Sequence, residues 1–535
     1  MHWADVMAQR LAERGDRHIV ATGITPSGEF HIGHIREILT GDMIARAARH
    51  AGLEAELVFV VDNADPLRKV YPFLDASYER FIGHQLGAIP APKADGTPDW
   101  DRFNNDGWTY GDHFLTPFLD ALAQLGVRPR LLPNLEAYRR GAFAPYAKAA
   151  CDQPERVREI IERISGRELP ETWFPWQPLD NNGSLDGVTV TGYDYPLVHF
   201  TAADGTTGTS DITKGEGKLP WRLDWPAKWG FNDVTCEPFG KDHGAAGGSY
   251  ATGRELAAMF GHAPPEPLTY EWISLRGQGA MSSSAGNTVG PVEALKLVPP
   301  EILRFLVANT KPNKAIEFDT GMGLVKLADE YERFAARNFK QELGKEGLSR
   351  RQKVQIEDAQ AALRLSAVTD GDLGTSAVVT FRHLALLAQV KPDDEAVLEA
   401  AGASGDSTAT TALLDRLNRM RTWVASSHFP DEIKVALVKE PVVAALQALE
   451  PHQQALVSVL SRTLEETEWT ENGVVQAMKA AATGDDVTMR DVYRAAYAIF
   501  LGAERGPRLA PILANCDRTT MLELTAACSA AMNSG

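Results

Sequence analysis

The sequence predicts an α/β fold built on a parallel sheet, with an inserted subdomain and an all-helical C-terminal region. Three observations favour this fold class. A strand–helix–strand pattern occupies the first 61 residues, strand and helix patterns return between residues 233 and 275, and Ala, Leu and Val recur at three- and four-residue spacing from about Pro299 onward. The length of 535 residues is enough for two to four domains.

The N-terminal elements form one βαβ unit. His18–Thr22 is an apolar run that ends in a glycine turn, Ile32–His50 has helical spacing, and Ala55–Val61 is a second apolar run. A strand, a helix and a strand in this order predict two parallel strands joined by a right-handed crossover. The next stretch, Pro90–Leu219, shows few clean periods, and we expect an inserted subdomain there.

The α/β pattern then returns. Asp233–Phe239 and Thr269–Leu275 are strand candidates, Gly247–Phe260 is a helix candidate between them, and Arg276–Gly290 is a loop rich in Gly and Ser. Helical spacing dominates the rest of the chain. We therefore expect residues 1–95 and 220–280 as two halves of the sheet domain, 96–219 as the insertion, 281–345 as a loop followed by helices, and 346–535 as the all-helical region.

Composition excludes several classes of protein. Lys plus Arg number 54 and Asp plus Glu 71, a formal net charge of −17, so any nucleic-acid partner must meet a locally basic face. The longest apolar run, Ala495–Ala503, is shorter than the roughly 20 residues of a membrane helix, and we expect no membrane partner. The four cysteines form no C-x-x-C pair, which argues against a disulfide scaffold and fits a cytoplasmic protein.

The segment Thr22–His34 joins the first strand to the first long helix. A parallel sheet presents its carboxyl edge at this point, and ligands of such sheets bind there. Gly28 and Gly33 allow the backbone to approach a ligand closely, and the helix start points N–H groups toward an anion. His31 and His34, three residues apart, can donate hydrogen bonds to phosphate. The alternative is a capped helix with surface histidines.

Several segments resemble one enzyme family. His31-Ile-Gly-His34 resembles the HIGH signature of class I aminoacyl-tRNA synthetases, and Ala280-Met-Ser-Ser-Ser284 resembles their second signature, KMSKS, in the form seen among class I lysyl-tRNA synthetases. Pro238–Ser249, Ala308–Ala315 and Phe318-Asp319 are also similar to the lysine enzymes. The order and separation of these segments agree over roughly residues 20–319, which makes the class I lysyl-tRNA synthetases the family that the chain resembles.

The resemblance implies a Rossmann-type catalytic domain and lysine–tRNA ligase activity. Such enzymes activate L-lysine with ATP and Mg²⁺ to lysyl-adenylate, release pyrophosphate, and transfer lysine to the 3′-terminal adenosine of tRNA(Lys). Positioning and charge stabilisation carry most of this chemistry. The resemblance assigns catalytic roles to His31, His34, Ser282, Ser283 and Ser284. It assigns ATP binding to Pro26, Ser27, Gly28, Gly33, Gly240, Asp242 and Met281.

A lysine site needs oxygen acceptors for an ammonium group and an apolar slot for the aliphatic stem. The family positions correspond to Gly23, Thr25, Trp221 and His243. An aromatic wall such as Trp221 suits an alkylammonium. Asp62 and Asp65 follow the second strand and could supply the countercharge. The alternatives are core packing for Trp221, a solvated loop or capping role for the aspartates, and a buried, satisfied histidine at position 243.

The sequence departs from the family pattern in two respects. Ala280 and Ala285 stand where the family has lysines beside the serine run, so a cation near the departing pyrophosphate is missing. We expect Arg276 and Lys241, the nearest basic residues in sequence, or Mg²⁺ to compensate. Several relatives carry Cys-rich zinc knuckles in the insertion, whereas residues 174–213 here contain no cysteine. We therefore predict no structural zinc and no metal ligands on the protein.

The lysine family has an anticodon-binding region at its helical C-terminus, and residues 346–535 correspond to it. Arg416, Arg419, Arg421 and Trp423 place cations and an aromatic ring within eight residues, a candidate surface for binding tRNA through unpaired anticodon bases. A second basic run extends from Arg337 to Lys353. The alternative for either cluster is a solvated helix face.

Two other functions stay open on sequence grounds. A lysine-adenylating paralogue could pass lysine to an acceptor other than tRNA, and a catalytically silent paralogue could bind tRNA or lysine for regulation. Ala280 and Ala285 favour both alternatives. The helical C-terminal region opposes the first alternative, and retention of His31 and His34 opposes the second.

Overall fold

The computed structural model describes residues 1–535 except 277–278, 281–289, 371–378, 404–407, 483–486 and 534–535. The chain divides into two compact units. The first comprises Met1–Leu295, Pro300–Phe318 and Phe334–Thr375, and the second comprises Lys296–Pro299, Asp319–Arg333 and Ser376–Gly535. Within the described residues, every strand belongs to the first unit, and the second unit is helical.

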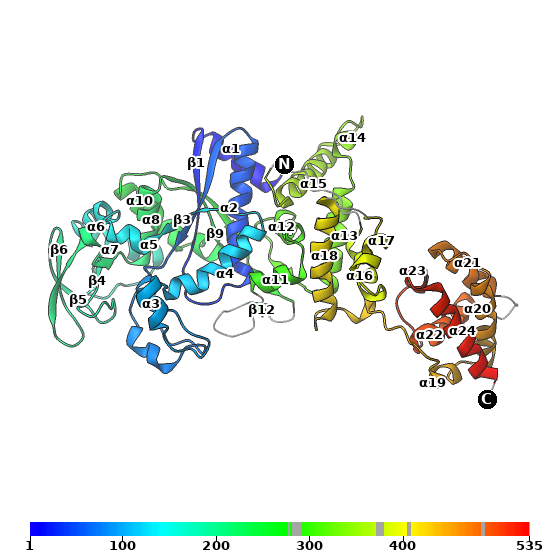
Figure 1. The fold of residues 1–535 in the computed structure, drawn as a ribbon. Helices are drawn as coiled ribbons and strands as arrows, with labels where there is room; N and C mark the ends of the chain where they lie inside the picture. Colours follow the sequence, from blue (N-terminus) through cyan, green and yellow to red (C-terminus); the bar gives the residue numbers. More distant parts are fainter. Residues whose placement is uncertain (277–278, 281–289, 371–378, 404–407, 483–486, 534–535) are drawn as a thin grey trace. The chain divides into compact units, whose positions relative to one another are not determined.

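A five-stranded parallel sheet forms the centre of the first unit, in the order β10-β9-β1-β2-β3 (Figure 1). Its strands are β1 (Arg17–Ile24), β2 (Glu54–Val61), β3 (Arg130–Pro133), β9 (Val234–Gly240) and β10 (Glu266–Tyr270). The register of β1 on β2 runs from Arg17 opposite Glu54 to Ile24 opposite Val61. Strands covered on both faces carry apolar residues at consecutive positions, as in the sequence of β2. The predicted α/β fold with a parallel sheet is confirmed.

Helices cover both faces of this sheet, because successive side chains of a strand point in opposite directions. α2 (Ile32–His50) packs on the face of Thr22, where Gly41 permits a close approach: a Cβ at Gly41 would lie 2.8 Å from Thr22 Cγ2. α8 (Trp221–Phe231) packs on the other face, against Ala21. The site therefore sits on a rigid, fully covered sheet.

Three small sheets complete the first unit, with orders β12-β11-β13, β4-β8 and β5-β6-β7. Their strands are β4 (Gln177–Pro178), β5 (Thr189–Asp194), β6 (Leu197–Thr201), β7 (Thr207–Asp211), β8 (Gly217–Lys218), β11 (Ile273–Leu275), β12 (Gly279–Ala280) and β13 (Ile316–Phe318). The other helices of this unit are α1 (Trp3–Ala12), η1 (Ala76–Phe81), η2 (Leu86–Ala88), α3 (Trp100–Asp106), α4 (Tyr110–Gln124), α5 (Asn134–Arg139), α6 (Ala144–Cys151), α7 (Pro154–Ser165), η3 (Ile212–Lys214), α9 (Lys241–Gly244), α10 (Ser249–Met259), α12 (Pro300–Ala308), α14 (Phe339–Leu343) and α15 (Arg350–Ser366). Two helices include residues of both units, α11 (Pro291–Leu297) and α13 (Met322–Ala335).

The prediction of one strand over Thr269–Leu275 is wrong, because this run is shared between two sheets. β10 ends at Tyr270 and pairs with β9, whereas β11 begins at Ile273 and pairs with β12 and β13. The chain leaves the main sheet at Glu271, whose N–H donates to the Pro312 carbonyl. A continuous strand-like pattern does not reveal a change of partner strand.

The stretch between Pro90 and Leu219 holds more regular elements than its few clean sequence periods indicate. This stretch contains α3 to α7, and α4 alone has 15 residues. α4 contains Pro117, and α5 and α6 have six and eight residues, so these helices complete too few regular turns to show a clear period. β3 also lies in the range expected as an insertion, yet it pairs with β2 in the main sheet.

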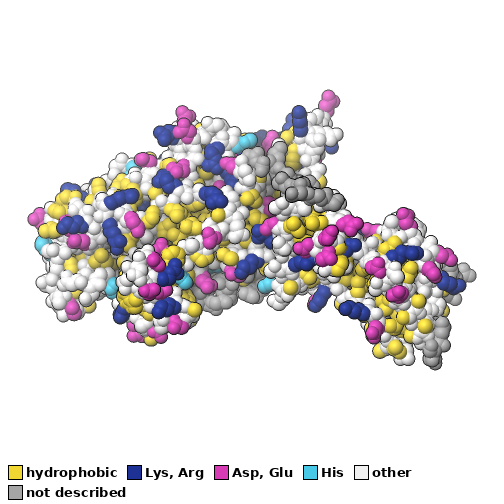
Figure 2. All heavy atoms as spheres, in the orientation of Figure 1, with side chains coloured by type: hydrophobic (Ala, Val, Ile, Leu, Met, Phe, Trp, Pro, Cys, Tyr) yellow, Lys and Arg dark blue, Asp and Glu magenta, His cyan; other side chains and the backbone are white. Residues whose placement is uncertain are grey.

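The second unit is built from helices, and the predicted all-helical C-terminal region is confirmed. Its elements are α16 (Phe381–Val390), α17 (Asp394–Ala400), α18 (Thr408–Ala425), η4 (Asp431–Ile433), α19 (Val443–Gln447), α20 (Pro451–Glu465), α21 (Glu471–Ala481), α22 (Met489–Leu501), α23 (Leu509–Ala514) and α24 (Arg518–Asn533). α20 to α24 enclose an apolar core around Leu460 and Ile499. On the face drawn in Figure 2, acidic and basic side chains of the molecule are interspersed.

Candidate active site

The predicted site residues of the sheet domain lie at one edge of the sheet, where the strand order reverses. β2 and β3 follow β1 on one side, and β9 and β10 lie on its other side. In open α/β sheets, ligands bind at the carboxyl ends of the strands that flank such a switch point. Gly23 lies in β1, Thr25 directly follows it, and Gly240 ends β9. The topology therefore brings the segment after β1 and the segment after β9 to the same edge of the sheet.

His31 and His34 cap the first long helix and contact each other. The Gly33 N–H donates to His31 Nδ1 at 3.1 Å, and the His31 N–H donates to His34 Nδ1 at 3.0 Å. Their ring centroids are 3.9 Å apart. This is a capping box in which two histidines take the places of the usual Ser and Glu. The capped-helix alternative is thus one part of this arrangement and does not compete with phosphate binding.

The capping bonds determine which ring nitrogen carries the proton. A neutral imidazole has one donor and one acceptor nitrogen, so the accepting Nδ1 leaves Nε2–H as the donor on both rings. Burial lowers the pKa of His31, and burial together with His31 lowers the pKa of His34 to about 3. Both rings are therefore neutral at pH 7. Two Nε2–H donors beside the N-terminus of α2 suit an anion such as phosphate.

The loop before the histidines carries other predicted ATP contacts. Tyr110 donates its O–H to the Ser27 carbonyl at 2.8 Å, Pro26 is buried, and Gly28 is half-buried. A Cβ on Gly33 would lie 2.7 Å from the His31 ring. Glycine at position 33 is thus required for the His31 cap, and its predicted contact with adenine stays a prediction.

Gly240 ends β9 and contacts an aromatic ring that the sequence analysis missed. A Cβ on Gly240 would lie 3.3 Å from Cη2 of Trp272, whose side chain is 47% exposed. The Trp272 backbone is held in place because its carbonyl accepts the Ile316 N–H at 3.0 Å. Asp242 is exposed on α9, directly after Gly240. Trp272 lies inside the run Thr269–Leu275 that the pattern predicts as one strand, so no separate sequence signal marks it.

The second predicted signature, with Met281, Ser282, Ser283, Ser284 and the neighbouring Ala285, lies outside the described residues. Residues before and after this signature contact the region of the first one. Arg36 of α2 donates to the carbonyl of Trp272, which precedes the second signature, at 3.2 Å, and to that of Lys314, which follows it, at 2.9 Å. A Cβ on Gly290 would lie 3.6 Å from the Phe30 carbonyl, and residues 29–30 and 290–293 line a cavity of about 220 Å³.

The two basic residues expected to compensate for the missing lysines lie on elements near this region. Lys241 pairs with Glu271 at 2.7 Å. Arg276 follows β11 and its N–H donates to the Phe318 carbonyl at 3.1 Å. Compensation by either residue stays a prediction.

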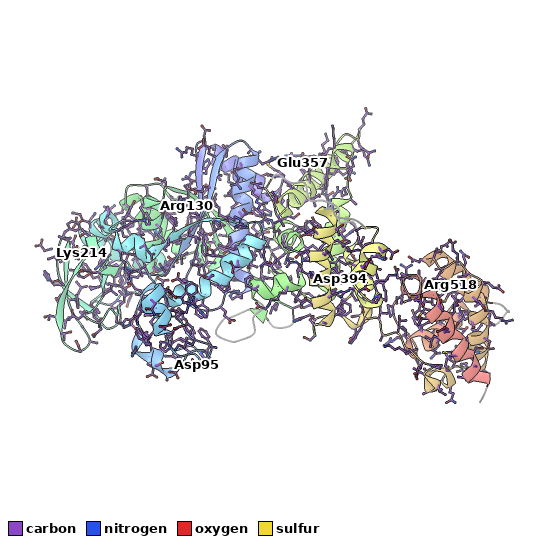
Figure 3. All side chains as sticks on the ribbon, in the orientation of Figure 1. Asp95, Arg130, Lys214, Glu357, Asp394 and Arg518 are labelled. Carbon is purple, nitrogen blue, oxygen red and sulfur yellow. The ribbon has the colours of Figure 1, made fainter. Side chains whose placement is uncertain are left out.

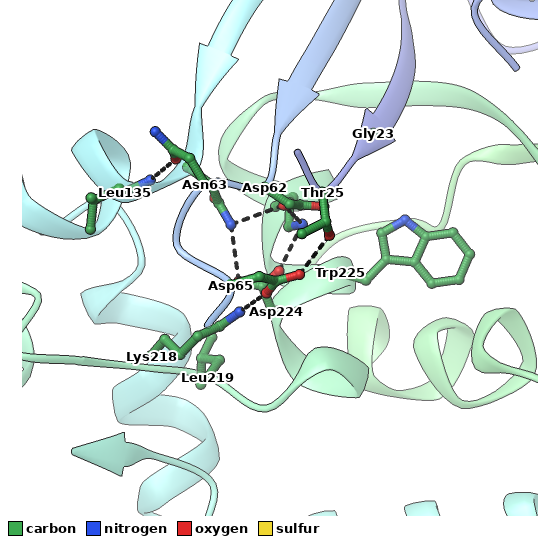
Figure 4. A network of polar contacts seen from close by, with 12 residues as sticks. Gly23, Thr25, Asp62, Asn63, Asp65, Leu135, Lys218, Leu219, Asp224 and Trp225 are labelled. Atoms are coloured by element: carbon green, nitrogen blue, oxygen red, sulfur yellow. Dashed lines mark hydrogen bonds and ion pairs between the residues drawn. The ribbon is translucent and has the colours of Figure 1, made fainter. Parts of the chain in front are cut away.

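Asp62 and Asp65 lie in a buried polar network after β2 (Figure 4). Asp62 pairs with Lys228 at 2.5 Å, and Lys228 also pairs with Asp224 at 2.7 Å. Asp65 pairs with Lys218. Both lysine side chains are 4% exposed. Burial would lower the pKa of Lys228, but Asp224 and Asp62 outweigh it and raise this pKa above its usual value.

The prediction that Asp62 and Asp65 neutralise a substrate ammonium is therefore corrected. Each carboxylate already has a buried lysine of the same chain as its partner. Lys218 and Lys228 are 153 and 166 residues away from these aspartates in sequence, and nothing local indicates the pairing. The fold alone brings them together.

A different acid lies beside Gly23. The Gly23 N–H donates to Oε1 of Glu37 at 2.9 Å, and Tyr270 donates its O–H to Oε2 at 2.9 Å. Burial raises the pKa of Glu37 to about 8. The sequence analysis missed this residue, although it lies three positions after His34 and thus on the same face of the helix. The described hydrogen bonds of the Glu37 carboxyl group come from the Gly23 N–H and the Tyr270 O–H, and neither Lys218 nor Lys228 pairs with it in these contacts.

Trp221 and His243 lie together, as the resemblance implies for a lysine site. Trp221 is 36% exposed, so it is not a core residue, and its ring stacks on Trp225 with centroids 5.4 Å apart. The His243 ring lies 5.9 Å from the Trp221 ring, and burial lowers its pKa. Trp225 in turn donates its indole N–H to the buried Glu237 at 2.9 Å. These aromatic rings provide an apolar wall.

The α18 residues predicted for tRNA do not form a stacking surface. Trp423 is fully buried, donates its indole N–H to the Thr320 carbonyl at 2.7 Å, and packs against Phe381. It therefore has no face for an unpaired base, and the prediction for Trp423 is corrected. Arg419 pairs with Asp415 at 2.9 Å and Arg421 with Asp394 at 2.8 Å. Burial raises the pKa of Glu332, and the charge of Arg416 opposes this shift without reversing it.

Among the residues that the structure describes, no group of three or more His, Cys, Asp or Glu side chains is arranged to hold a metal ion. None of the helices in this part of the chain combines the length and apolar character of a membrane span.

Comparisons with known proteins agree with this geometry. Residues 1–360 match the family model described as tRNA synthetases class I (K). The lysine–tRNA ligase of Picrophilus torridus is 35% identical over 98% of both chains, and that of Thermoplasma volcanium is 36% identical over 97% of both. A solved glutamate tRNA ligase from Elizabethkingia meningosepticum is 13% identical, with a TM-score of 0.42, over 97% of this chain and 99% of that chain.

The structural similarity is too low to support an argument, so the assignment depends on the sequence relatives and the family model. These cover the chain from the βαβ unit to the helical region. The resemblance seen in the two signatures is thereby confirmed. The chain belongs to the class I tRNA synthetases of the lysine (K) family.

Proposed function

We propose that this chain is a lysine–tRNA ligase that forms lysyl-adenylate from L-lysine and ATP and then transfers lysine to the 3′-terminal adenosine of tRNA(Lys). The observation that carries the proposal is the histidine pair at the switch point of the sheet. Its capping bonds present two neutral Nε2–H donors beside a helix N-terminus. Family membership and the relatives named as lysine–tRNA ligases support it.

In the first step, the lysine carboxylate attacks the α-phosphorus of ATP and pyrophosphate leaves. The Nε2–H groups of His31 and His34 donate to phosphate oxygens as negative charge develops on them. Pro26, Ser27 and Gly28 lie along the triphosphate, with Gly240 and Asp242 near the ribose. Met281 and Ser282 to Ser284 are proposed for the same phosphates. Mg²⁺ binds to the triphosphate, which agrees with its preference for phosphate oxygens and water.

The lysine pocket combines the end of β1 with the aromatic wall. Thr25 and Glu37 supply oxygen acceptors, Gly23 leaves room beside them, and Trp221 and His243 line the aliphatic stem. Glu37 replaces Asp62 and Asp65 as the proposed countercharge. Burial raises the pKa of Glu37 to about 8, and the positive charge of an ammonium group beside it favours the ionised carboxylate.

Trp272 provides a flat, exposed surface for the adenine ring. Its indole lies over Gly240 at the end of β9, close to the proposed ribose contacts. Stacking of a base on an aromatic side chain contributes about 1–3 kcal/mol.

The transfer of lysine to tRNA and the location of the protein in the cell are part of the same proposal. The all-helical region, with Arg416, Arg419 and Arg421, is proposed to meet tRNA through charge alone, since Trp423 is buried. The protein acts in the cytoplasm. The net charge of −17 makes any such contact local and dependent on salt.

Lysine-dependent ATP–pyrophosphate exchange tests the proposal, run across the twenty amino acids with and without tRNA. We expect exchange with lysine alone among them, and a loss of about 10²–10³-fold in kcat for His31→Ala and for His34→Ala. His452→Ala, an exposed histidine of the helical unit, should leave the rate unchanged. Exchange without charging of tRNA would assign a different acceptor, and no exchange at all would assign a binding role.

A further inference from the structure

The Thr25 hydroxyl is tied to a buried ion pair that the proposed reaction does not use. Thr25 donates its O–H to Oδ2 of Asp65 at 2.7 Å, while Lys218 bonds to Oδ1 of the same carboxylate (Figure 4). The side chains of Lys218 and Asp65 are 4% and 15% exposed. Thr25 itself is half-buried at the carboxyl end of β1. Lys218, Asp65 and Thr25 form a row of hydrogen-bonded groups that ends at the sheet edge.

The protonation states of Asp65 and Lys218 follow from their surroundings. Burial would raise the pKa of Asp65, but Lys218, Lys228 and the Thr25 hydrogen bond together outweigh burial and lower it. Burial would likewise lower the pKa of Lys218, and Asp65 and Asp224 together outweigh it and raise this pKa. Asp65 is therefore an ionised carboxylate at pH 7, and an ionised carboxylate only accepts hydrogen bonds.

A hydroxyl group has one proton to donate and two lone pairs with which to accept. Asp65 accepts the hydrogen bond from the Thr25 O–H, so the Thr25 oxygen has only its lone pairs left for a ligand. An ammonium group has three donors and no acceptor. The Thr25 oxygen in this state matches an ammonium and mismatches a carboxylate or a carbonyl.

We propose that Lys218 and Asp65 are positioning residues which hold the Thr25 hydroxyl as a hydrogen-bond acceptor for an ammonium group of the substrate lysine. This inference rests on the proposed function, because it assumes that lysine binds at the end of β1. Lys218 comes from β8, outside the main sheet, and its side chain, 4% exposed, pairs with Asp65. Its role is to keep Asp65 ionised in a buried place.

The neighbouring lysine shows why the effect belongs to one pair. Lys228 is equally buried, but its partners are Asp62 and Asp224, and these carboxylates bond to Asn134 and Tyr138. Lys228 also helps to lower the pKa of Asp65 through its charge, but the carboxylate that accepts from Thr25 is hydrogen-bonded to Lys218. Lys218 is therefore the lysine that holds the carboxylate which orients the Thr25 hydroxyl.

The test compares the KM values of lysine and ATP in the exchange reaction. Asp65→Asn keeps the shape of the side chain but can donate to Thr25 and reverse its hydroxyl, and Thr25→Val removes the acceptor. We expect both variants to raise the lysine KM about 10–100-fold, in line with a lost hydrogen bond to a charged group, with ATP KM and kcat within about threefold of wild type. Thr25→Ser, which keeps the hydroxyl, should restore most of the affinity.

Lys218→Met should behave like Asp65→Asn. Its matched control is Lys214→Met, which removes another ion-paired lysine of the same part of the chain, 68% exposed and paired with Asp211 at 3.2 Å. Lys214→Met should have wild-type values. Should Lys218→Met fail to fold, the comparison of Asp65→Asn, Thr25→Val and Thr25→Ser still decides the matter.

Two competitive inhibitors then identify the ammonium. L-norleucine keeps only the α-ammonium of lysine, and 6-aminohexanoate keeps only the terminal one. Asp65→Asn should weaken whichever inhibitor makes the Thr25 contact and leave the other unchanged. Equal changes in lysine and ATP KM, or an unchanged lysine KM with only a lower stability, would overturn the inference. If wild-type protein performs no lysine-dependent exchange, the proposed function fails instead.

Discussion

The charged residues at the sheet edge and those on α18 differ in what holds them. Lys218 and Lys228 are 4% exposed and pair with Asp65 and Asp62, which follow a distant strand, and Lys228 also pairs with the buried Asp224 of its own helix. Arg419 pairs with Asp415 one turn earlier on the same helix, where the aspartate is 57% exposed. Arg421 pairs with Asp394 of α17, marked in Figure 3, which is 46% exposed.

This difference teaches how far each kind of sequence signal can be followed. Asp62 and Asp65 are predicted from their position after a strand of the sheet, whereas their lysine partners come from distant parts of the sequence. The α18 cluster was found from composition alone, and it consists of surface ion pairs around a buried tryptophan. Exposed pairs contribute about 0–1 kcal/mol to stability, whereas removing one partner of a buried pair costs about 3–5 kcal/mol.

The largest expected effect is on stability, at Lys228. Lys228→Met leaves Asp62 and Asp224 buried without their cation, and we expect the free energy of unfolding of the first unit to fall by about 3–5 kcal/mol. Urea unfolding followed by circular dichroism measures it. Arg130→Met, which breaks the exposed pair with Glu56, should cost about 0–1 kcal/mol. Equal losses for the two variants would remove the distinction between the regions.

The next effect is on lysine binding and its pH dependence, at Glu37. The ammonium needs the ionised carboxylate, and the Glu37 pKa of about 8 means that this form is lost as the pH falls. We expect the lysine KM to rise about tenfold per pH unit between pH 8 and 6, since each unit costs about 1.4 kcal/mol. Glu37→Gln should raise the KM at pH 8 by about 10–100-fold and flatten this profile.

Glu56→Gln is the control for this experiment, because Glu56 is an exposed acid paired with Arg130. It should keep the wild-type profile. A steep profile that persists in Glu37→Gln would show that another group titrates.

A smaller effect is expected for ATP at Trp272. Trp272→Ala removes the exposed ring over Gly240, and we expect the ATP KM to rise about tenfold at unchanged lysine KM. Trp272→Phe should recover most of the difference because it keeps an aromatic face. Trp100→Ala, which removes another exposed tryptophan of the first unit, should leave both KM values as they are.

The smallest effect is expected on α18. Arg421→Gln breaks an exposed ion pair, and we expect less than about 1 kcal/mol of stability to be lost. Binding of tRNA(Lys), measured by filter retention at fixed salt, should weaken by about two- to fivefold, because Arg421 is proposed to contribute one charge to phosphate binding. An unchanged affinity would remove Arg421 from the proposed tRNA contacts.

The features that the sequence predicts correctly are those whose signal depends on neighbouring residues. β1, α2, β2 and β9 were predicted near their observed bounds, because apolar periodicity and glycine turns depend on neighbouring residues only. The histidine cap is equally local, with its partners within three residues. The family signatures then identified the class of enzyme, since their order and separation are properties of the chain.

Side-chain partners required the folded molecule. Lys218 and Lys228 neutralise Asp65 and Asp62 only because the chain returns to this edge some 150 residues later, and no periodicity records that return. The residues from Thr269 to Leu275 divide between two sheets because distant strands pair with them. Trp423 is a core residue because it packs against Phe381 and donates to the Thr320 carbonyl. Burial and charge depend on which distant segments meet, so they follow from packing and not from local pattern.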